Sequence, residues 1–288
     1  MAWRILKTAV DQWSEHRSAR MGAALAYYSV FSMGPLLLIV TSIAGLFFGA
    51  DSVRGELSSQ FNALLGPTGS KAVEAMLEGA SSPHSGRLAA LTGVVLLLVA
   101  ALGVVSQLKD AINTIWNVAA PKDVHVTWYI RTYLISFAGI LGVGFLLAVS
   151  LVISTGLAAV SSRLSTATTI IAILTNTAAS LVLLSILFAM MFKWFPDTEI
   201  AWRDVFPGAI ATAILFNLGK FAIGWYIGTQ GLESSYGAAA SIVVLLVWVY
   251  YSAQIVLFGA ELTHAYATTV GSLRTKTPEL ELPHIASR

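Results

Sequence analysis

The chain contains no cysteine, and only 11% of its 288 residues are charged. Without cysteine it has no disulfide bonds, no thiol chemistry and no cysteine-ligated zinc. A soluble domain of average composition carries about 25% charged residues, so this chain has too few to cover a water-exposed surface. Its net charge of +2 is also small. Nucleic-acid binding needs a basic patch or stripe, so we expect no nucleic-acid partner.

Hydrophobic residues make up 56% of the chain and gather in six long runs. A helix needs about 20 apolar residues to cross the hydrocarbon core of a bilayer, and each run is long enough. Lipid offers no partner for backbone N–H and C=O groups, so such runs are expected to be helices. The predicted fold class is all-α: a polytopic membrane protein with six transmembrane helices, forming a single domain over residues 1–288. The runs are Met21–Ala50, Leu88–Leu108, Thr132–Ser162, Leu164–Phe192, Val205–Gly228 and Ser234–Ala260.

Lysine and arginine are distributed unevenly between the connections of this topology. Cytoplasmic loops of membrane proteins are enriched in these residues, so both termini are predicted to be cytoplasmic. Residues 267–288, after the last run, are predicted to be a flexible cytoplasmic tail. The basic residues on the predicted cytoplasmic side are Arg4, Lys7, Arg17, Arg20, Lys109, Lys122, Arg131, Lys193, Arg203, Arg274, Lys276 and Arg288.

Two stretches outside the runs have amphipathic patterns. In residues 1–22, Trp3, Leu6 and Val10 recur at helical spacing, which is typical of a helix lying on the membrane surface. A soluble N-terminal helix is the alternative. The first outer connection, over residues 51–87, predicts two short helices interrupted by a Gly-Pro pair.

Lys220 is the one charged residue inside the fifth run. An ionisable side chain at membrane depth costs about 2.5–3.5 kcal/mol on insertion scales, so it marks a candidate functional site. Asn217 lies three residues earlier and therefore on the same helical face. In one interpretation Lys220 lines a polar cavity and meets an anionic substrate. In the other it is a structural lysine bonded to backbone carbonyls of a broken helix.

Polar side chains in the first and last runs complete the predicted substrate pathway. Tyr28 and Ser32 precede Pro35, which removes a backbone hydrogen bond, so a kink or local unwinding is expected there. Tyr250 and Gln254 share one helical face nearer the middle of the last run. Broken helices beside polar side chains commonly form binding sites in transporters. A plain proline kink, with hydroxyls bonded back to the helix, is the alternative.

Three further polar residues, Asp110, Asn113 and Glu261, are predicted to make contacts on the cytoplasmic side. Asp110 and Asn113 continue the second run as an amphipathic helix. Asp110 is interpreted either as a gate or proton relay or as part of a solvated helix end. Glu261 lies about 20 Å from Lys220 at helical rise, so the two are not expected to pair.

Small residues at helical spacing provide surfaces on which membrane helices pack closely. Examples are Gly45-x-x-x-Gly49 and Gly224-x-x-x-Gly228. Such spacings are common in membrane helices, so we expect packing within the chain, with a homo-oligomer as the alternative.

Enzyme chemistry receives little support from the sequence. There is no GxSxG elbow and no phosphate-binding loop. The five histidines are scattered, with no His-x-His or His-x-x-x-His spacing that would suggest a metal site. We therefore expect no catalytic residues, no metal and no cofactor.

Several sequence stretches between residues 18 and 270 together resemble those of a known protein family. They are Ala23–Ser29, Gln107–Trp116, Phe195–Asp197, Pro207–Ala209, Gly219–Lys220, Ser235–Gly237, Leu246–Gln254 and Phe258–Glu261. In this combination the chain resembles the YihY/virulence factor BrkB family of bacterial inner-membrane proteins. Ala240 and Asn117 stand where that family often has glycine.

The resemblance implies a six-helix, multi-pass protein of the bacterial cytoplasmic (inner) membrane, linked by name to virulence. Export or lipid-handling roles have been suggested for the family, which was also labelled ribonuclease BN. A metallo-hydrolase of that kind needs a His-x-His-x-Asp-His cluster, which this sequence lacks. The ribonuclease label is therefore not expected to apply.

The predicted function is transport or export of a small solute or lipid-like amphiphile through a polar intramembrane cavity. The alternative is a non-transporting membrane scaffold or partner-binding protein of the envelope. Its working surfaces would be the amphipathic N-terminus and the first outer connection. The expected partners are the lipid bilayer and a small solute or lipid.

Overall fold

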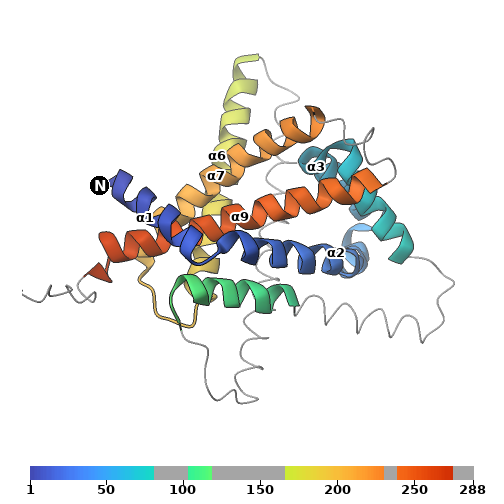
Figure 1. Cartoon of the computed structure of the whole chain (residues 1–288). Helices are drawn as coiled ribbons and strands as arrows, with labels where there is room; N and C mark the ends of the chain where they lie inside the picture. Colours follow the sequence, from blue (N-terminus) through green and yellow to red (C-terminus); the bar gives the residue numbers. More distant parts are fainter. Residues whose placement is uncertain (81–102, 119–165, 230–238, 275–288) are drawn as a thin grey trace, which may run out of the picture.

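The computed structural model describes residues 1–80, 103–118, 166–229 and 239–274 (Figure 1). Every regular element in these ranges is helical, which confirms the all-α prediction for this part of the chain. The elements are α1 (Ala2–Glu15), α2 (Ser18–Phe48), α3 (Ala50–Ala80), a helix over residues 103–115, α6 (Thr166–Trp194), α7 (Trp202–Thr229) and α9 (Ala240–Thr269).

Three of these helices are long and apolar enough to cross a membrane. The spans are Thr177–Trp194 in α6, Trp202–Ile223 in α7 and Ala240–Thr269, which is α9. They correspond to the fourth, fifth and sixth predicted runs, and α2 contains most of the first. The second run lies mostly, and the third wholly, outside the described residues. The six-span topology and the cytoplasmic side of both termini stay predictions.

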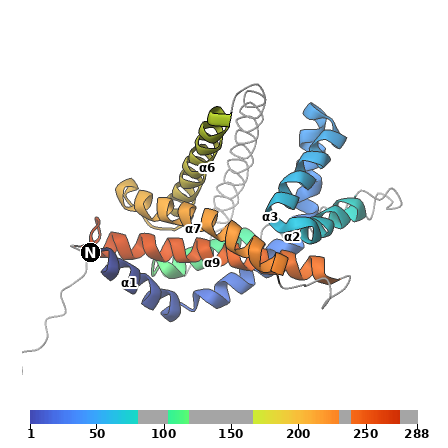
Figure 2. The same cartoon turned by 90° about the horizontal axis from the view of Figure 1, so that it is seen from above.

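Helix α9 lies at the centre of the described structure. It packs against α7 and α2, and it also contacts α1 and α3. In Figure 1, α9 runs between α2 and α7, with α1 near one end and α3 near the other. Helix α6 packs against α7, and Figure 2 shows it projecting from the layer that α7 and α9 form. A helix with neighbours on several sides must be apolar around most of its circumference, as the sequence of α9 is.

Two Gly-x-x-x-Thr segments hold α7 against α9 in a reciprocal arrangement. A Cβ placed on Gly208 of α7 would lie 1.9 Å from Thr263 Oγ1, and one placed on Gly259 of α9 would lie 1.9 Å from Thr212 Oγ1. Each threonine hydroxyl donates to the carbonyl of the glycine four residues earlier in its own helix. Higher residue numbers on α7 meet lower ones on α9, so the helices run antiparallel. We call this contact the Gly-Thr seam.

Two clusters of buried apolar side chains lie along α9. One surrounds its C-terminal half and brings Leu257 together with Phe192 of α6, Val205 of α7 and Ile112. The other surrounds its N-terminal half and joins Leu245 to side chains of α2 and α3. The two halves of α9 are therefore held by different neighbours.

Helix α3 consists of two helical pieces joined at Gly66. The φ of 72° and ψ of 178° at Gly66 are not helical and suit glycine. Pro67 follows, and its fixed φ and missing N–H suit the start of a helix. The second piece buries Val73 and Leu77 in the cluster at the N-terminal half of α9. The interruption predicted from the Gly-Pro pair is confirmed.

The N-terminal helix is shorter than the predicted 1–22. Helix α1 ends at Glu15, Arg17 has a left-handed φ of 55°, and α2 begins at Ser18. Residues 18–22 therefore belong to the first long helix, because the chain changes direction at Arg17. Ala9 is fully buried, and α1 packs on α9.

The apolar face of α1 is left uncovered in the described structure. Trp3 is 74% exposed, and Leu6 and Val10 are also exposed. The charged Arg4 and Lys7 are exposed on the same helix. This combination is typical of a helix that rests on a membrane surface, with apolar side chains among the lipids and basic ones near headgroups.

The start of the predicted flexible tail is instead packed on the helices. Helix α9 continues to Thr269, and Ala267 is fully buried. Beyond the helix, the Ser272 N–H donates to Asp204 Oδ2 at 3.1 Å, and its hydroxyl donates to the same oxygen. The Asp204 carboxylate is buried and needs such donors, which holds this end of the chain against α7. Residues 275–288 lie outside the described part.

Candidate functional site

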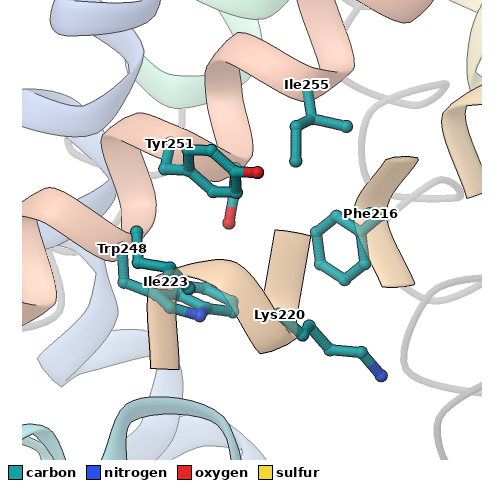
Figure 3. Close-up of a pocket in the computed structure, with 7 residues that line it drawn as sticks. Phe216, Lys220, Ile223, Trp248, Tyr251 and Ile255 are labelled. Atoms are coloured by element: carbon teal, nitrogen blue, oxygen red, sulfur yellow. The ribbon is translucent and has the colours of Figure 1, made fainter. Parts of the chain in front are cut away.

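Lys220 lies on α7 in a shallow recess between α7 and α9 (Figure 3). The side chain is half-buried, and its amine points away from Tyr251 and Trp248. Among the described residues, this recess has no room for an enclosed water molecule, and the polar cavity predicted beside Lys220 stays a prediction. The lining residues are Phe216, Lys220, Ile223, Trp248, Tyr251, Ser252 and Ile255.

Gly219 lets a side chain of α9 approach the backbone of α7 beside Lys220. A Cβ placed on Gly219 would lie 2.6 Å from Tyr251 Oη and 2.9 Å from Ile255 Cδ1. Because glycine has no side chain, the phenol ring of Tyr251 lies directly against α7. Lys220 and Tyr251 thus line the same recess from neighbouring helices, with the lysine amine directed away from the phenol (Figure 3).

Three hydrogen-bond donors in the recess are left without a partner in the described chain. They are the amine of Lys220 and the hydroxyls of Tyr251 and Ser252. All three residues are half-buried. Within the described residues, the recess therefore offers donors without matching acceptors.

Asn217 does not join Lys220 at the recess. Its Nδ2 donates to the Ala213 carbonyl at 3.0 Å, four residues earlier in α7. The amide is thus bonded back to its own helix. Although Asn217 and Lys220 are separated by one helical turn, only Lys220 lines the recess.

The polar residues of the first run lie on α2. Ser32 Oγ donates to the Ser29 carbonyl at 3.0 Å. Tyr28 is partly exposed, and its ring packs edge-on against Tyr27 at 5.6 Å between centroids. Helix α2 is uninterrupted through Pro35, so the expected local unwinding is not found. For Ser32 the structure shows the alternative prediction, a hydroxyl bonded back to the helix.

Tyr250 and Gln254 lie on α9 but outside the recess. Tyr250 is exposed, and Gln254 Nε2 donates to the Ala19 carbonyl of α2 at 3.3 Å. The other amide atom, Gln254 Oε1, is buried and has no partner in the described chain. The seven predicted pathway residues are therefore not gathered at one place, and their part in a pathway stays a prediction.

Glu261 is fully buried where α9 meets the junction of α1 and α2. Its Oε1 is 2.9 Å from His16 Nδ1 and accepts the Ser18 hydroxyl at 3.1 Å. One helical turn later, His264 Nδ1 lies 3.3 Å from Gln12 Oε1. These contacts tie the N-terminal segment to α9. We call this group the Glu261 cluster.

A second polar contact joins the helix over 103–115 to the turn after α6. Lys109 Nζ lies 2.8 Å from Asp197 Oδ1, and Asn113 Nδ2 donates to Asp197 Oδ2 at 3.0 Å. The backbone N–H of Asp197 in turn donates to Asn113 Oδ1 at 2.8 Å. Asp110 is exposed beside this contact and contributes no side-chain bond to it. Partial burial raises the pKa of Asp110 above its usual value, and the positive charge of the neighbouring Lys109 offsets only part of this rise.

Several residues of these contacts were not singled out from the sequence as site residues. Tyr251 and Ser252 adjoin the predicted Tyr250, and a helix places consecutive residues on different faces, so only the packing shows which one reaches α7. His16 and Asp197 come from segments remote in sequence from their partners. No local pattern could have paired them. Among the described residues, no three His, Asp or Glu side chains gather as metal ligands would.

Comparison with known proteins yields one family match that covers most of the chain. The model of the family described as Virulence factor BrkB matches residues 9–281. Those residues include every helix described above except the first turns of α1. No solved structure matches the chain.

Similar curated proteins are named UPF0761 membrane proteins. That of Stenotrophomonas maltophilia strain K279a is 28% identical over 93% of this chain and 61% of its own length. That of Neisseria meningitidis serogroup B is 26% identical over 91% of this chain and 62% of its own length. One from Alteromonas mediterranea is 30% identical over 83% of this chain and 79% of its own length. The chain thus spans about three fifths of the first two relatives.

Proposed function

Because the chain belongs to the Virulence factor BrkB family of membrane proteins, we propose that it moves a small solute or lipid-like amphiphile across the bacterial inner membrane. The observation that carries this proposal is the position of Lys220. It is a cation in an apolar helix, half-buried and unpaired within the described chain. A charge at membrane depth costs free energy, so its presence is best explained by use. The proposed role involves no enzymatic step.

The proposed route follows the outer surface of α7 and α9, because the recess is too shallow to enclose a hydrated solute. A polar group of the substrate would meet Lys220. Its apolar part would lie against Phe221 and Trp225, which are 77% and 73% exposed on α7. Transport along a protein–lipid boundary suits an amphiphile better than a fully polar solute.

Flux measurements on reconstituted vesicles test the proposal. Wild type and Lys220→Ala are compared for uptake and efflux of a panel of metabolites and labelled lipids. We expect at least one compound to move with wild type and about tenfold more slowly with Lys220→Ala, the effect of losing one charge-assisted hydrogen bond. Lys7→Ala removes an exposed lysine of α1 and serves as the matched control. Equal flux in wild type and Lys220→Ala for every compound that moves would contradict the proposal.

A membrane scaffold is the second candidate, favoured by the uncovered apolar face of α1. Trp3 and Leu6 are exposed there, and such a surface suits attachment rather than transport. The same vesicles separate the two functions. A wild-type protein that moves no compound, while Trp3→Asp abolishes a cellular phenotype of the intact gene, would favour the scaffold.

A further inference from the structure

The unpartnered donors of the recess indicate the charge of a ligand. Lys220, Tyr251 and Ser252 together offer an ammonium and two hydroxyls, and none has a partner in the described chain. A phosphate group has several oxygens that can accept hydrogen bonds at once, and its negative charge strengthens each of them. A neutral ligand would leave the lysine charge uncompensated in an apolar environment.

The carboxylates of α7 and α9 do not compensate this charge. Asp204 on α7 accepts hydrogen bonds from Ser272, and Glu261 on α9 contacts His16 and Ser18. Both lie at the far end of the helix pair. The antiparallel register places Gly208 beside Thr263 at that end, whereas Tyr251 packs on Gly219 beside Lys220. The counter-charge for Lys220 must therefore come from elsewhere.

The surroundings of the recess indicate that the ligand is a lipid. Leu218, Phe221 and Trp225 lie on the same helix as Lys220 and are exposed. The recess itself is lined by apolar side chains such as Phe216 and Ile223. In a membrane-spanning helix such exposed side chains contact acyl chains. The amine points out of the recess, so a headgroup reaches it without entering the helix bundle (Figure 3).

We propose that the recess at Lys220 binds the phosphate group of an anionic phospholipid whose acyl chains lie along α7 and α9. Lys220 supplies both the charge and the hydrogen bonds to the phosphate, because its amine points out of the recess and away from Tyr251 (Figure 3). The inference rests on the proposed function in one respect: the bound lipid would be the amphiphile that the protein moves. Binding itself is a separate equilibrium and is measured without flux.

Native mass spectrometry of the full chain in detergent tests the binding. Phosphatidylglycerol and zwitterionic phosphatidylcholine are titrated in turn into wild type, Lys220→Met and Lys220→Arg, with helix content checked by circular dichroism. We expect wild type to prefer phosphatidylglycerol by at least about tenfold and Lys220→Met to lose that preference, as expected for one charge-assisted hydrogen bond. Lys220→Arg keeps the charge and should keep most of the preference.

Two further arms identify the source of the phosphate and the role of the hydroxyls. Free glycerol phosphate should not displace the lipid at equal concentration, because it lacks the acyl chains. Tyr251→Phe combined with Ser252→Ala should leave the preference for phosphatidylglycerol unchanged, because the Lys220 amine points away from these hydroxyls (Figure 3). Full preference in Lys220→Met, or displacement by glycerol phosphate, would overturn the inference.

The outcomes also separate this inference from the proposed function. Phosphatidylglycerol binding that depends on Lys220, without any flux in vesicles, supports the lipid site and contradicts transport. Flux of a non-lipid solute that depends on Lys220, without lipid preference, supports transport and overturns the lipid site.

Discussion

The polar side chains in the two halves of helix α9 lie in different environments. In the C-terminal half, Glu261, Thr263 and His264 are buried, and each has a hydrogen-bonding partner. In the N-terminal half of the helix, Tyr250 is exposed, and Tyr251 and Ser252 are half-buried. Within the described residues, Tyr251 and Ser252 have no partner. One oxygen of the buried group, Glu261 Oε2, has no partner in the described chain. The two regions of α9 therefore differ mainly in burial: the polar side chains of the first are enclosed by neighbouring helices, and those of the second are partly accessible.

This contrast separates structural polar groups from available ones. A buried polar group without a partner costs free energy, and His16 and Ser18 offset that cost for one carboxylate oxygen of Glu261, Oε1. Half-buried donors that have no partner in the described part of the chain can still bind lipid, water, a ligand or the rest of the protein. The comparison therefore gives the buried contacts of Glu261 a structural role and leaves the region of Tyr251 accessible to other molecules. Substitutions in each region test that assignment.

The largest effect is expected at the Gly-Thr seam. In Gly208→Ala the new methyl group would meet the Cα of Thr263 as well as its side chain, so rotation of the threonine cannot relieve the clash. Overpacking of this kind destabilises a protein by about 1–3 kcal/mol, and we expect a lower unfolding midpoint in detergent. Gly55→Ala is the matched control, because a Cβ there meets nothing within 4 Å. An equal midpoint in both variants would contradict the close approach of α7 and α9.

The next largest effect is expected from Glu261→Ala. The substitution leaves His16 and Ser18 without their acceptor, which should cost about 1.5–3 kcal/mol for hydrogen bonds to a charged group. Since these bonds hold the α1–α2 junction on α9, hydrogen exchange should become faster in residues 2–18 and stay unchanged in α7. Glu261→Gln keeps one acceptor and should have a smaller effect. Unchanged protection of α1 in Glu261→Ala would show that apolar packing alone holds it.

A smaller effect is expected at the contact between Lys109 and Asp197. The ion pair is partly exposed at Asp197, and exposed pairs contribute about 0.2–1 kcal/mol. Lys109→Ala and Asp197→Ala, singly and together, form a double-mutant cycle measured by unfolding in detergent. High salt should reduce the coupling energy because it screens exposed charges. A coupling energy of zero at low salt would mean that the contact does not stabilise the fold.

The smallest effect on stability is expected at the recess. Tyr251→Phe and Ser252→Ala remove hydroxyls that have no partner in the described chain. Each should change stability by less than about 0.5 kcal/mol, as surface substitutions do. The measurement is the unfolding midpoint in detergent without added lipid. A loss as large as that of Glu261→Ala would show that these hydroxyls are structural and would remove the contrast between the two regions.

The helices themselves followed from local patterns, and the site did not. The apolar runs predicted α6, α7 and α9, and the Gly-Pro pair predicted the interruption in α3 at Gly66. Helical spacing placed Lys220 and Asn217 on one face. Their different roles depend on the neighbours: the Asn217 amide turns back to Ala213, while Lys220 reaches the recess. Spacing along one helix contains no information about what the next helix presents.

Some errors of the sequence interpretation have the same physical origin. A kink or local unwinding was expected at Pro35, and the unwinding is not found, because a helix can lose one hydrogen bond and continue. Residues after 267 were expected to be flexible because they follow the apolar run, yet the buried Asp204 holds Ser272. That partner lies far away in the sequence. Long-range contacts of this kind decide where an element ends.

The sequence alone determined the environment of this protein and its class of structure. Long uncharged runs can satisfy their backbone in lipid only as helices, whatever their neighbours are. Only the tertiary structure decided which polar side chains bond to other parts of the described chain and which have no partner there. The reason is that folding brings together hydrogen-bonding partners that are far apart in the sequence, such as His16 and Glu261. Folding also places the donors around Lys220 where the described chain offers them no acceptor.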